Sequence, residues 1–128
     1  MIRYFKDYIF IITTIFFTVC GQLLIKKGSS LLGSFSNDKV NVLFFLVKAM
    51  FKPYIMLGLI CAAVGAIAWI GALSKFKLSY AYSFASLSFV FVMVFSQVIF
   101  KEYISLIQWI GIIMICLGFV LATHLTYK

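Results

Sequence analysis

Residues 53–100 read PYIMLGLICAAVGAIAWIGALS, then KFK, then LSYAYSFASLSFVFVMVFSQVIF. Two long apolar stretches, 53–74 and 78–100, are therefore separated by only three residues, and all charge in this segment lies on Lys75 and Lys77. A helix needs about 20 mostly apolar residues to cross a hydrocarbon core, so each stretch is long enough to span a bilayer. The short connection between them predicts a hairpin of two antiparallel transmembrane helices.

Further uncharged stretches flank this hairpin on both sides, at residues 8–25 and 103–127. Hydrocarbon offers no partner for backbone N–H and C=O groups, so all four stretches are expected to be helices. No small-x-small cleavage site closes the first stretch, which is therefore expected to be a retained helix and not a secretory signal. The sequence predicts an all-α membrane protein with a single domain over residues 1–128. Its transmembrane helices are expected over residues 8–26, 54–74, 78–100 and 104–125.

The connection between the first two spans, residues 28–52, is much longer than the others. Its first half is rich in Gly and Ser, which is typical of a loop. Its second half, residues 40–52, is apolar and aromatic, is too short to span, and carries Lys48 and Lys52. We predict a short interfacial amphipathic helix there, with Pro53 breaking the helix before the next span. The alternative is an early start of the second transmembrane helix.

The composition excludes an ordinary soluble domain. Hydrophobic residues make up 65% of the 128 residues and charged residues only 11%. Soluble proteins carry about 25% charged residues. Lys and Arg number 11 and Asp and Glu number 3, which gives a formal charge of +8. The cations lie near span ends, where they anchor to lipid head groups, and they form no basic cluster of the kind that binds nucleic acid.

The positive charge is divided almost evenly across the membrane. With four spans, the side of the termini carries Arg3, Lys6, Lys75, Lys77 and Lys128. The opposite side carries Lys26, Lys27, Lys39, Lys48, Lys52 and Lys101. The positive-inside rule needs an imbalance to select one orientation, and this sequence supplies almost none. Two interpretations remain open: another feature sets the topology, or the chain inserts both ways and forms an antiparallel homodimer.

The sequence contains no evident constellation of catalytic or metal-ligating residues. Its three cysteines each fall within an apolar stretch and are interpreted as packing residues. Its three acids lie at stretch ends or in the long connection, so none is embedded in the membrane, and His124 is interpreted as an interfacial residue. We therefore expect no enzyme activity, no metal and no cofactor, which leaves transport or membrane scaffolding.

Two stripes of polar residues mark candidate contacts inside the membrane. One stripe, at three- and four-residue spacing in the third span, consists of Ser79, Tyr82, Ser83 and Ser86. The other, at steps of four in the first span, consists of Thr14, Thr18, Gln22 and Lys26. The third-span stripe is either the wall of a cavity that binds a polar head group or a packing surface whose hydroxyls bond backbone carbonyls. The first-span stripe leads to a cation suited to a phosphate, unless Lys26 only snorkels to the interface.

Pairs of glycines seven residues apart mark two smooth helix faces. Gly58 and Gly65 form one pair in the second span, and Gly111 and Gly118 form another in the fourth. Seven residues return to nearly the same face, so both pairs permit close helix approach. The fourth-span pair is expected to be a dimer seam, with packing inside one subunit as the alternative. Before it, residues 105–108 (SLIQ) match a capping box.

Several strings in a fixed order resemble the drug/metabolite transporter superfamily. They are GQLLIK at 21–26, YIMLGL at 54–59, WIGAL at 69–73, LSYAY at 78–82, SLSFV at 86–90, EYIS at 102–105 and QWIG at 108–111. The resemblance covers nearly the whole chain. The departures are Lys101, where Gly often precedes the acid, and Tyr103, which replaces a common Pro.

Four-helix members of this superfamily are of two kinds. The small multidrug-resistance exporters are antiparallel dimers that exchange cationic drugs for protons, and they carry a glycine pair similar to Gly111 and Gly118. Aligning Gly21 and Lys26 with theirs places Thr18 where they have an essential acid, which argues against proton-coupled drug export. The EamA-like half-transporters, which include subunits that flip undecaprenyl-phosphate-linked aminoarabinose, are more similar in their Gly-Gln-Leu and Leu-Ser strings.

This second resemblance implies a flippase in the bacterial inner membrane that carries an undecaprenyl-phosphate-linked sugar. It also implies a homodimer, or a heterodimer with a similar four-helix subunit. The substrate-binding residues are then expected to be Thr18, Gln22, Lys26, Trp69, Tyr80, Tyr82, Ser83 and Ser86.

In this hypothesis, Gln22 and Lys26 contact the phosphate, the third-span residues contact the sugar, and Trp69 closes the cavity. Lys101 and Glu102 are expected to form a gate or cap at the interface. The alternatives are an exporter of small cations or metabolites and a non-transporting subunit of a larger membrane assembly.

Overall fold

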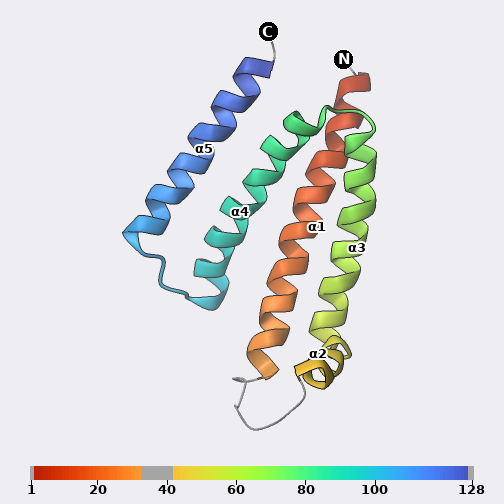
Figure 1. Ribbon diagram of the computed structural model, residues 1–128, viewed down its shortest axis with the longest axis vertical. Coiled ribbons are helices and arrows are strands. Elements are labelled where there is room, and N and C mark those ends of the chain that lie inside the picture. The colour runs from red at the N-terminus through yellow and green to blue at the C-terminus, as the bar shows by residue number, and fades with distance from the viewer. Residues whose placement is uncertain (1, 33–41, 127–128) are drawn as a thin grey trace.

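The computed structural model describes residues 2–32 and 42–126 of the chain, and Figure 1 shows their arrangement. Every regular element within these residues is a helix. The five helices are α1 (Ile2–Leu32), α2 (Val42–Met50), α3 (Pro53–Leu73), α4 (Leu78–Phe100) and α5 (Leu106–Thr126). Four of them, α1, α3, α4 and α5, are long and apolar enough to cross a membrane. The prediction of an all-α membrane protein with four spans is confirmed.

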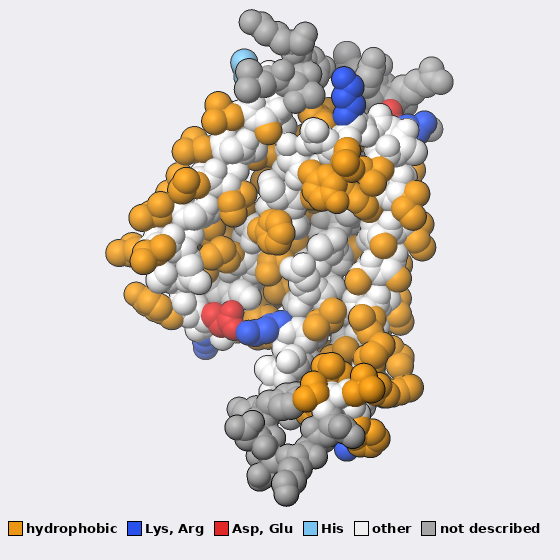
Figure 2. Space-filling model, in the orientation of Figure 1, with side chains coloured by type: hydrophobic (Ala, Val, Ile, Leu, Met, Phe, Trp, Pro, Cys, Tyr) orange, Lys and Arg blue, Asp and Glu red, His pale blue; other side chains and the backbone are white. Residues whose placement is uncertain are grey.

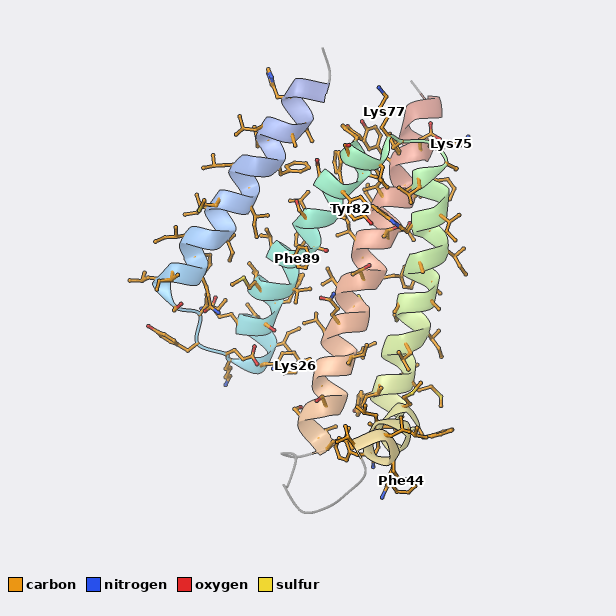
Figure 3. The ribbon with its side chains drawn as sticks, viewed as in Figure 1. Lys26, Phe44, Lys75, Lys77, Tyr82 and Phe89 are labelled. Atoms are coloured by element: carbon orange, nitrogen blue, oxygen red, sulfur yellow. The ribbon has the colours of Figure 1, made fainter. Side chains whose placement is uncertain are left out.

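The four spans alternate in direction. The two termini lie at one end of the bundle together with the α3–α4 connection, whereas α2 and the α4–α5 connection lie at the other end (Figure 1). Figure 2 shows hydrophobic side chains along the sides of the spans and charged side chains gathered toward the two ends. Lys75 and Lys77 lie at the end of the termini and Lys26 lies toward the opposite end (Figure 3). This distribution fits helices whose sides face lipid and whose ends reach the head groups.

α1 and α3 pack along most of their length through glycine faces. A Cβ atom on Gly58 would lie 2.6 Å from Cγ1 of Ile25 and 2.9 Å from the carbonyl oxygen of Gly21. Gly65, seven residues farther along α3, is also buried, and a Cβ on it would lie against α1. Small residues let two backbones approach closely in a membrane. The prediction of a smooth packing face at Gly58 and Gly65 is therefore confirmed.

α1 continues beyond the predicted span at both ends. The expectation of a loop from residue 28 onward is wrong for residues 28–32, which are helical. At this end Gly28 packs tightly on α3, because an added Cβ would lie 2.5 Å from Cγ1 of Ile55. Contact with α3 therefore holds a segment of low helix propensity in the helix. The next part of the expected loop, residues 33–41, lies outside the described residues.

α2 falls within the predicted interfacial segment and lies beside the start of α3 (Figure 1). Most of its apolar side chains are exposed, including Leu43 and Phe44, and it carries Lys48 in its last turn. Pro53 begins α3 directly after Lys52, which has extended backbone angles (φ −71°, ψ 136°). The predicted break at Pro53 is confirmed, and α2 is a separate helix rather than an early start of the second span.

α5 packs against α4 and stands apart from α1 and α3 (Figure 1). Phe84 of α4 and Phe119 of α5 meet edge to face, with ring centroids 5.0 Å apart. At the start of α5 the backbone N–H of Ser105 donates to Oε1 of Gln108 at 2.8 Å. The N–H of Gln108 donates in return to Oγ of Ser105 at 3.4 Å, so the predicted capping box is confirmed.

Candidate functional site

An open pocket of about 290 Å³ lies among α1, α3 and α4. Small side chains on α3 and α4 leave this space, and a few hydroxyl groups and two aromatic rings interrupt its mostly apolar wall. Its lining residues are Thr14, Ile15, Thr18, Ala62, Gly65, Ala66, Trp69, Tyr82, Ala85 and Ser88. Three of the expected substrate-binding residues, Thr18, Trp69 and Tyr82, are therefore brought together here from three different helices.

Trp69 and Tyr82 form an aromatic pair across the α3–α4 boundary of the pocket. Their ring centroids are 5.2 Å apart and the rings are nearly perpendicular, at 85°. Such edge-to-face packing orients both rings and keeps the indole N–H and the phenol O–H available for polar contacts. Tyr82 is 58% exposed, so one side of the pair faces the surroundings of the protein (Figure 3).

Two buried hydroxyls in the pocket wall were not among the expected site residues. Thr14 is 8% exposed and its Oγ1 donates to the carbonyl oxygen of Phe10 at 2.8 Å. Ser88 is also 8% exposed and its Oγ donates to the carbonyl oxygen of Ala85 at 2.6 Å. Because each O–H is used within its own helix, each oxygen still offers lone pairs to a ligand. Thr14 belongs to the first-span polar stripe. Ser88 was not predicted, although three-residue steps from Tyr82 through Ala85 place it on the same face of the helix.

Ser83 and Ser86 lie outside the pocket lining and bond to their own helix. Ser83 Oγ donates to the carbonyl oxygen of Ser79 at 3.0 Å, and Ser86 Oγ donates to that of Ser83 at 2.6 Å. Of the two interpretations of the third-span stripe, these bonds are closer to the one in which the hydroxyls bond backbone carbonyls than to a cavity wall. The carbonyls, however, belong to the same helix and not to a neighbouring one. Helical spacing placed these serines on one face but did not reveal that their O–H groups already have acceptors.

Tyr80 also lies outside the pocket lining, in an aromatic cluster at the end of the bundle near the termini. Its hydroxyl lies 2.9 Å from that of Tyr8 on α1. The Tyr8 ring packs against Phe76 and Phe84, with centroid separations of 5.2 Å and 6.1 Å. The Tyr80 ring packs against the same two residues at 5.6 Å and 5.0 Å. This cluster joins α1 to α4 beyond the pocket.

At the opposite end, Lys26 of α1 forms a salt bridge with Glu102 in the α4–α5 connection. Lys26 Nζ and Glu102 Oε1 are 2.7 Å apart, and the two side chains are 51% and 42% exposed. The hydrogen bond from Lys26 is the largest influence on the carboxyl group and holds the pKa of Glu102 below its ordinary value. Lys26 lies outside the pocket lining, and so does Gln22, which is exposed.

The expected gate pair of Lys101 and Glu102 is thus divided between two roles. Glu102 contacts Lys26, whereas Lys101 ends α4 in the left-handed region, with φ 53°. Lys101 is the only non-glycine residue with positive φ in the described part of the chain. Its backbone turns the chain so that the next residue points back toward α1.

Gly111 and Gly118, the expected dimer seam, face open space. No heavy atom of the described residues lies within 4 Å of a Cβ built on either glycine. The apolar side chains Ile107, Met114 and Leu121 of the same helix are also exposed. Packing inside one subunit therefore does not account for the glycine pair, and α5 offers a smooth apolar face to lipid or to another protein.

Four apolar spans, three of which line a pocket that carries hydroxyl groups, are typical of a small multi-pass membrane protein of the transporter class. Residues 7–124 match the EamA-like transporter family, and the chain belongs to this family. The expected resemblance to the drug/metabolite transporter superfamily is confirmed. The family name and those of the relatives described next indicate a transporter rather than an enzyme.

Two curated relatives share about half of the chain. A probable 4-amino-4-deoxy-L-arabinose-phosphoundecaprenol flippase subunit ArnE of Aeromonas salmonicida is 32% identical over 71 residues, 56% of this chain and 62% of the relative. A protein of the same name from Pseudomonas fluorescens is 29% identical over 67 residues, 52% of this chain and 59% of the relative. The matched segment therefore covers less than two thirds of either relative's length. No solved structure matches the chain at a significant level.

Proposed function

We propose that this chain is a subunit of a flippase that moves an undecaprenyl-phosphate-linked sugar, such as aminoarabinose, across the bacterial inner membrane. The observation that carries the proposal is the open pocket of about 290 Å³ among three apolar spans, whose mostly apolar wall carries a few hydroxyl groups. This volume is at the lower end of ligand pockets, which suits one sugar ring rather than an oligosaccharide. The two relatives named as flippase subunits for such a lipid support the same substrate class.

The pocket offers the sugar hydrogen-bonding groups without a fixed charge. Thr14, Thr18 and Ser88 contribute hydroxyl oxygens, and Trp69 and Tyr82 contribute ring faces and polar edges. The polyprenyl tail remains in the bilayer, where the exposed apolar sides of the spans already face lipid. In this proposal Lys26 and Gln22 receive the phosphate, because an ammonium group is a good phosphate partner.

The same lining disfavours the alternative of a cation exporter. Neither Asp nor Glu occurs among the pocket-lining residues of the described chain, and Thr18 lines the wall on α1. Cationic groups inside membranes usually pair with acids or with backbone carbonyls. The rings of Trp69 and Tyr82 can contact a cation, but the lining offers it no acidic counter-charge, whereas the hydroxyl groups suit a sugar.

We infer that the working unit contains a second four-helix subunit, identical or similar to this one. The exposed glycine face of α5 supports this inference, as does the word "subunit" in the names of both relatives. A pocket closed by only three helices also leaves Tyr82 substantially exposed, and a facing subunit would cover it.

The proposal is tested in proteoliposomes that hold the chain alone, and in others that hold it with a second four-helix subunit from the same organism. The lipid probe is undecaprenyl phosphate-aminoarabinose, whose amine is labelled from outside, and the competing probe is tetraphenylphosphonium. We expect translocation of the lipid above that of empty vesicles and no accumulation of the cation. Accumulation of the cation without lipid translocation would overturn the proposal in favour of the exporter, and inactivity toward both would favour a scaffold.

A further inference from the structure

The Lys26–Glu102 salt bridge ties α1 to the loop that leads into α5. Figure 3 shows Lys26 near the lower end of α4, and the 2.7 Å contact joins residues that are far apart in sequence. Lys26 lies eight residues beyond Thr18, which is about 12 Å along an α-helix. The ion pair therefore lies outside the pocket, on the path between the pocket and one membrane surface.

The pair has the properties of a contact that opens easily. Both side chains are about half exposed, and ion pairs of this kind contribute little net stability because water solvates the separated charges. The pKa of Glu102 is held below its ordinary value, so the carboxylate is an anion at neutral pH.

We propose that Glu102 occupies the position on Lys26 that the phosphate of an anionic lipid takes during transport, so that the arriving lipid exchanges one anion for another. This inference rests on the proposed function. Carboxylate and phosphate oxygens both accept charge-assisted hydrogen bonds from an ammonium group, which has no fixed fork geometry and accommodates either. The exchange keeps Lys26 paired at every stage and releases the α4–α5 connection from α1. Glu102 thus makes the site selective for anionic ligands, since a neutral or cationic ligand cannot displace it from Lys26.

The neighbouring lysine provides a matched control. Lys27 has the same charge and lies at nearly the same depth, but its Nζ lies 5.1 Å from the ring centroid of Tyr54 on α3. Lys26 therefore points to the α4–α5 connection, whereas Lys27 points to α3. Removing the charge of Lys27 changes the local potential without removing the partner of Glu102.

The experiment measures binding of decaprenyl phosphate, with decaprenol as the uncharged probe, to the full chain in nanodiscs. Glu102→Gln removes the competing anion, so the fraction of protein with a free Lys26 rises and the apparent affinity rises by the same factor, up to about fivefold for an exposed ion pair. We expect Lys26→Gln to bind the phosphate at least about tenfold more weakly, because it loses one charge-assisted hydrogen bond. The double variant should match Lys26→Gln, and Lys27→Gln should match the wild type. Decaprenol binding should not change in any variant.

Equal or weaker phosphate binding by Glu102→Gln overturns the exchange, and so does a wild type that binds the phosphate no better than the alcohol. Glu102→Ala is the second variant, and elution as a single species confirms that each variant is folded. The exchange and the proposed function fail separately. Tighter binding by Glu102→Gln with no translocation of the lipid-linked sugar rejects the flippase and retains the exchange. Translocation of the lipid-linked sugar by the wild type, with no gain in phosphate affinity in Glu102→Gln, rejects the exchange and retains the flippase.

Discussion

The hydroxyl oxygens of Tyr8 and Tyr80 lie 2.9 Å apart and join the first turns of the α1 span to the first turn of α4. At the other end of the bundle, the salt bridge between Lys26 and Glu102 joins α1 to the α4–α5 connection. The pocket lies between these two contacts, which differ in their physics. The aromatic contact depends on ring packing, whereas the ionic contact weakens with added salt and is lost in acid.

Tyr8→Phe should destabilise the protein modestly by removing the hydrogen bond and keeping the ring. A hydrogen bond of this type contributes about 1 kcal/mol net. Thermal unfolding in detergent measures the effect. Tyr103→Phe is the matched control, since Tyr103 is 91% exposed and its hydroxyl faces solvent or head groups. Equal unfolding temperatures for the two variants would show that the Tyr8–Tyr80 contact contributes nothing to stability.

The sequence predicts the spans, the break at Pro53 and the glycine face on α3 because these follow from local hydropathy, local backbone preference and helical spacing. It does not predict the Tyr8–Tyr80 contact, which joins residues 72 positions apart and depends on how α1 and α4 cross. The same limitation applies to Gly28, whose loop-like neighbours conceal that α3 packs against it. Periodicity identifies a face, but the partner of that face is decided by tertiary packing.

In the candidate site, too, the sequence predicts some residues and tertiary packing decides the others. Thr18, Trp69 and Tyr82 were expected in a cavity and do line the pocket. Ser83 and Ser86 have the same spacing and chemistry, and their hydroxyls bond their own helix like those of Thr14 and Ser88, yet they lie outside the lining. Serine and threonine hydroxyls satisfy themselves on carbonyls three or four residues earlier, so a polar stripe predicts a cavity wall only where neighbouring helices leave space.

Gly58→Ala should lower the stability of the fold, whereas Gly118→Ala should not. The added Cβ at Gly58 meets the backbone oxygen of Gly21 at 2.9 Å, so α1 and α3 must separate, at a cost of about 1–3 kcal/mol. The added Cβ at Gly118 meets nothing in the described chain. Thermal unfolding should therefore show a loss only for Gly58→Ala.

The same pair of positions tests the expected dimer seam. Gly118→Leu should leave the unfolding temperature of the monomer unchanged and weaken self-association or assembly with a second subunit, because a large side chain prevents close helix approach. Cross-linking in membranes and analytical ultracentrifugation in detergent measure assembly. Unchanged assembly in Gly118→Leu would place the subunit interface elsewhere and leave the α5 glycine face to lipid.

Lys101→Gly should stabilise the protein. Lys101 has φ 53°, and the left-handed conformation costs about 1–2 kcal/mol for a residue with a Cβ. Glycine removes that cost but loses more entropy on folding, so the expected gain is about 1 kcal/mol or less. Lys101→Ala removes the same charge and keeps the Cβ. A gain in both variants would assign the effect to charge, whereas a gain in the glycine variant alone assigns it to the backbone.

Acidification should break the Lys26–Glu102 pair. The pKa of Glu102 is lowered in the folded protein, first by its hydrogen bond with Lys26, and a hydrogen bond with Ser96 also contributes. Its stabilising effect is therefore fully present above the ordinary carboxyl pKa of about 4.3 and is lost as the pH falls through the lowered value. The unfolding temperature of the wild type should fall more steeply than that of Glu102→Gln below about pH 4.3. Parallel curves would contradict a coupled pair.

Filling the pocket should separate the two stages of the proposed transport cycle. Ala66 lines the pocket on α3, whereas Ala63, about one turn earlier on the same helix, is not part of the lining. Ala66→Leu inserts three carbon atoms into a space that suits one sugar ring, so translocation of the sugar-linked lipid should fall by at least about tenfold, as expected when a ligand group no longer fits. In our proposal the phosphate of decaprenyl phosphate contacts Lys26 and Gln22, both outside the pocket lining, so its affinity should stay at the wild-type value. Ala63→Leu adds the same side chain facing lipid and should change neither quantity. Loss of phosphate binding in Ala66→Leu would mean that Lys26 and the pocket form one site, because two stations about 12 Å apart along α1 should respond independently.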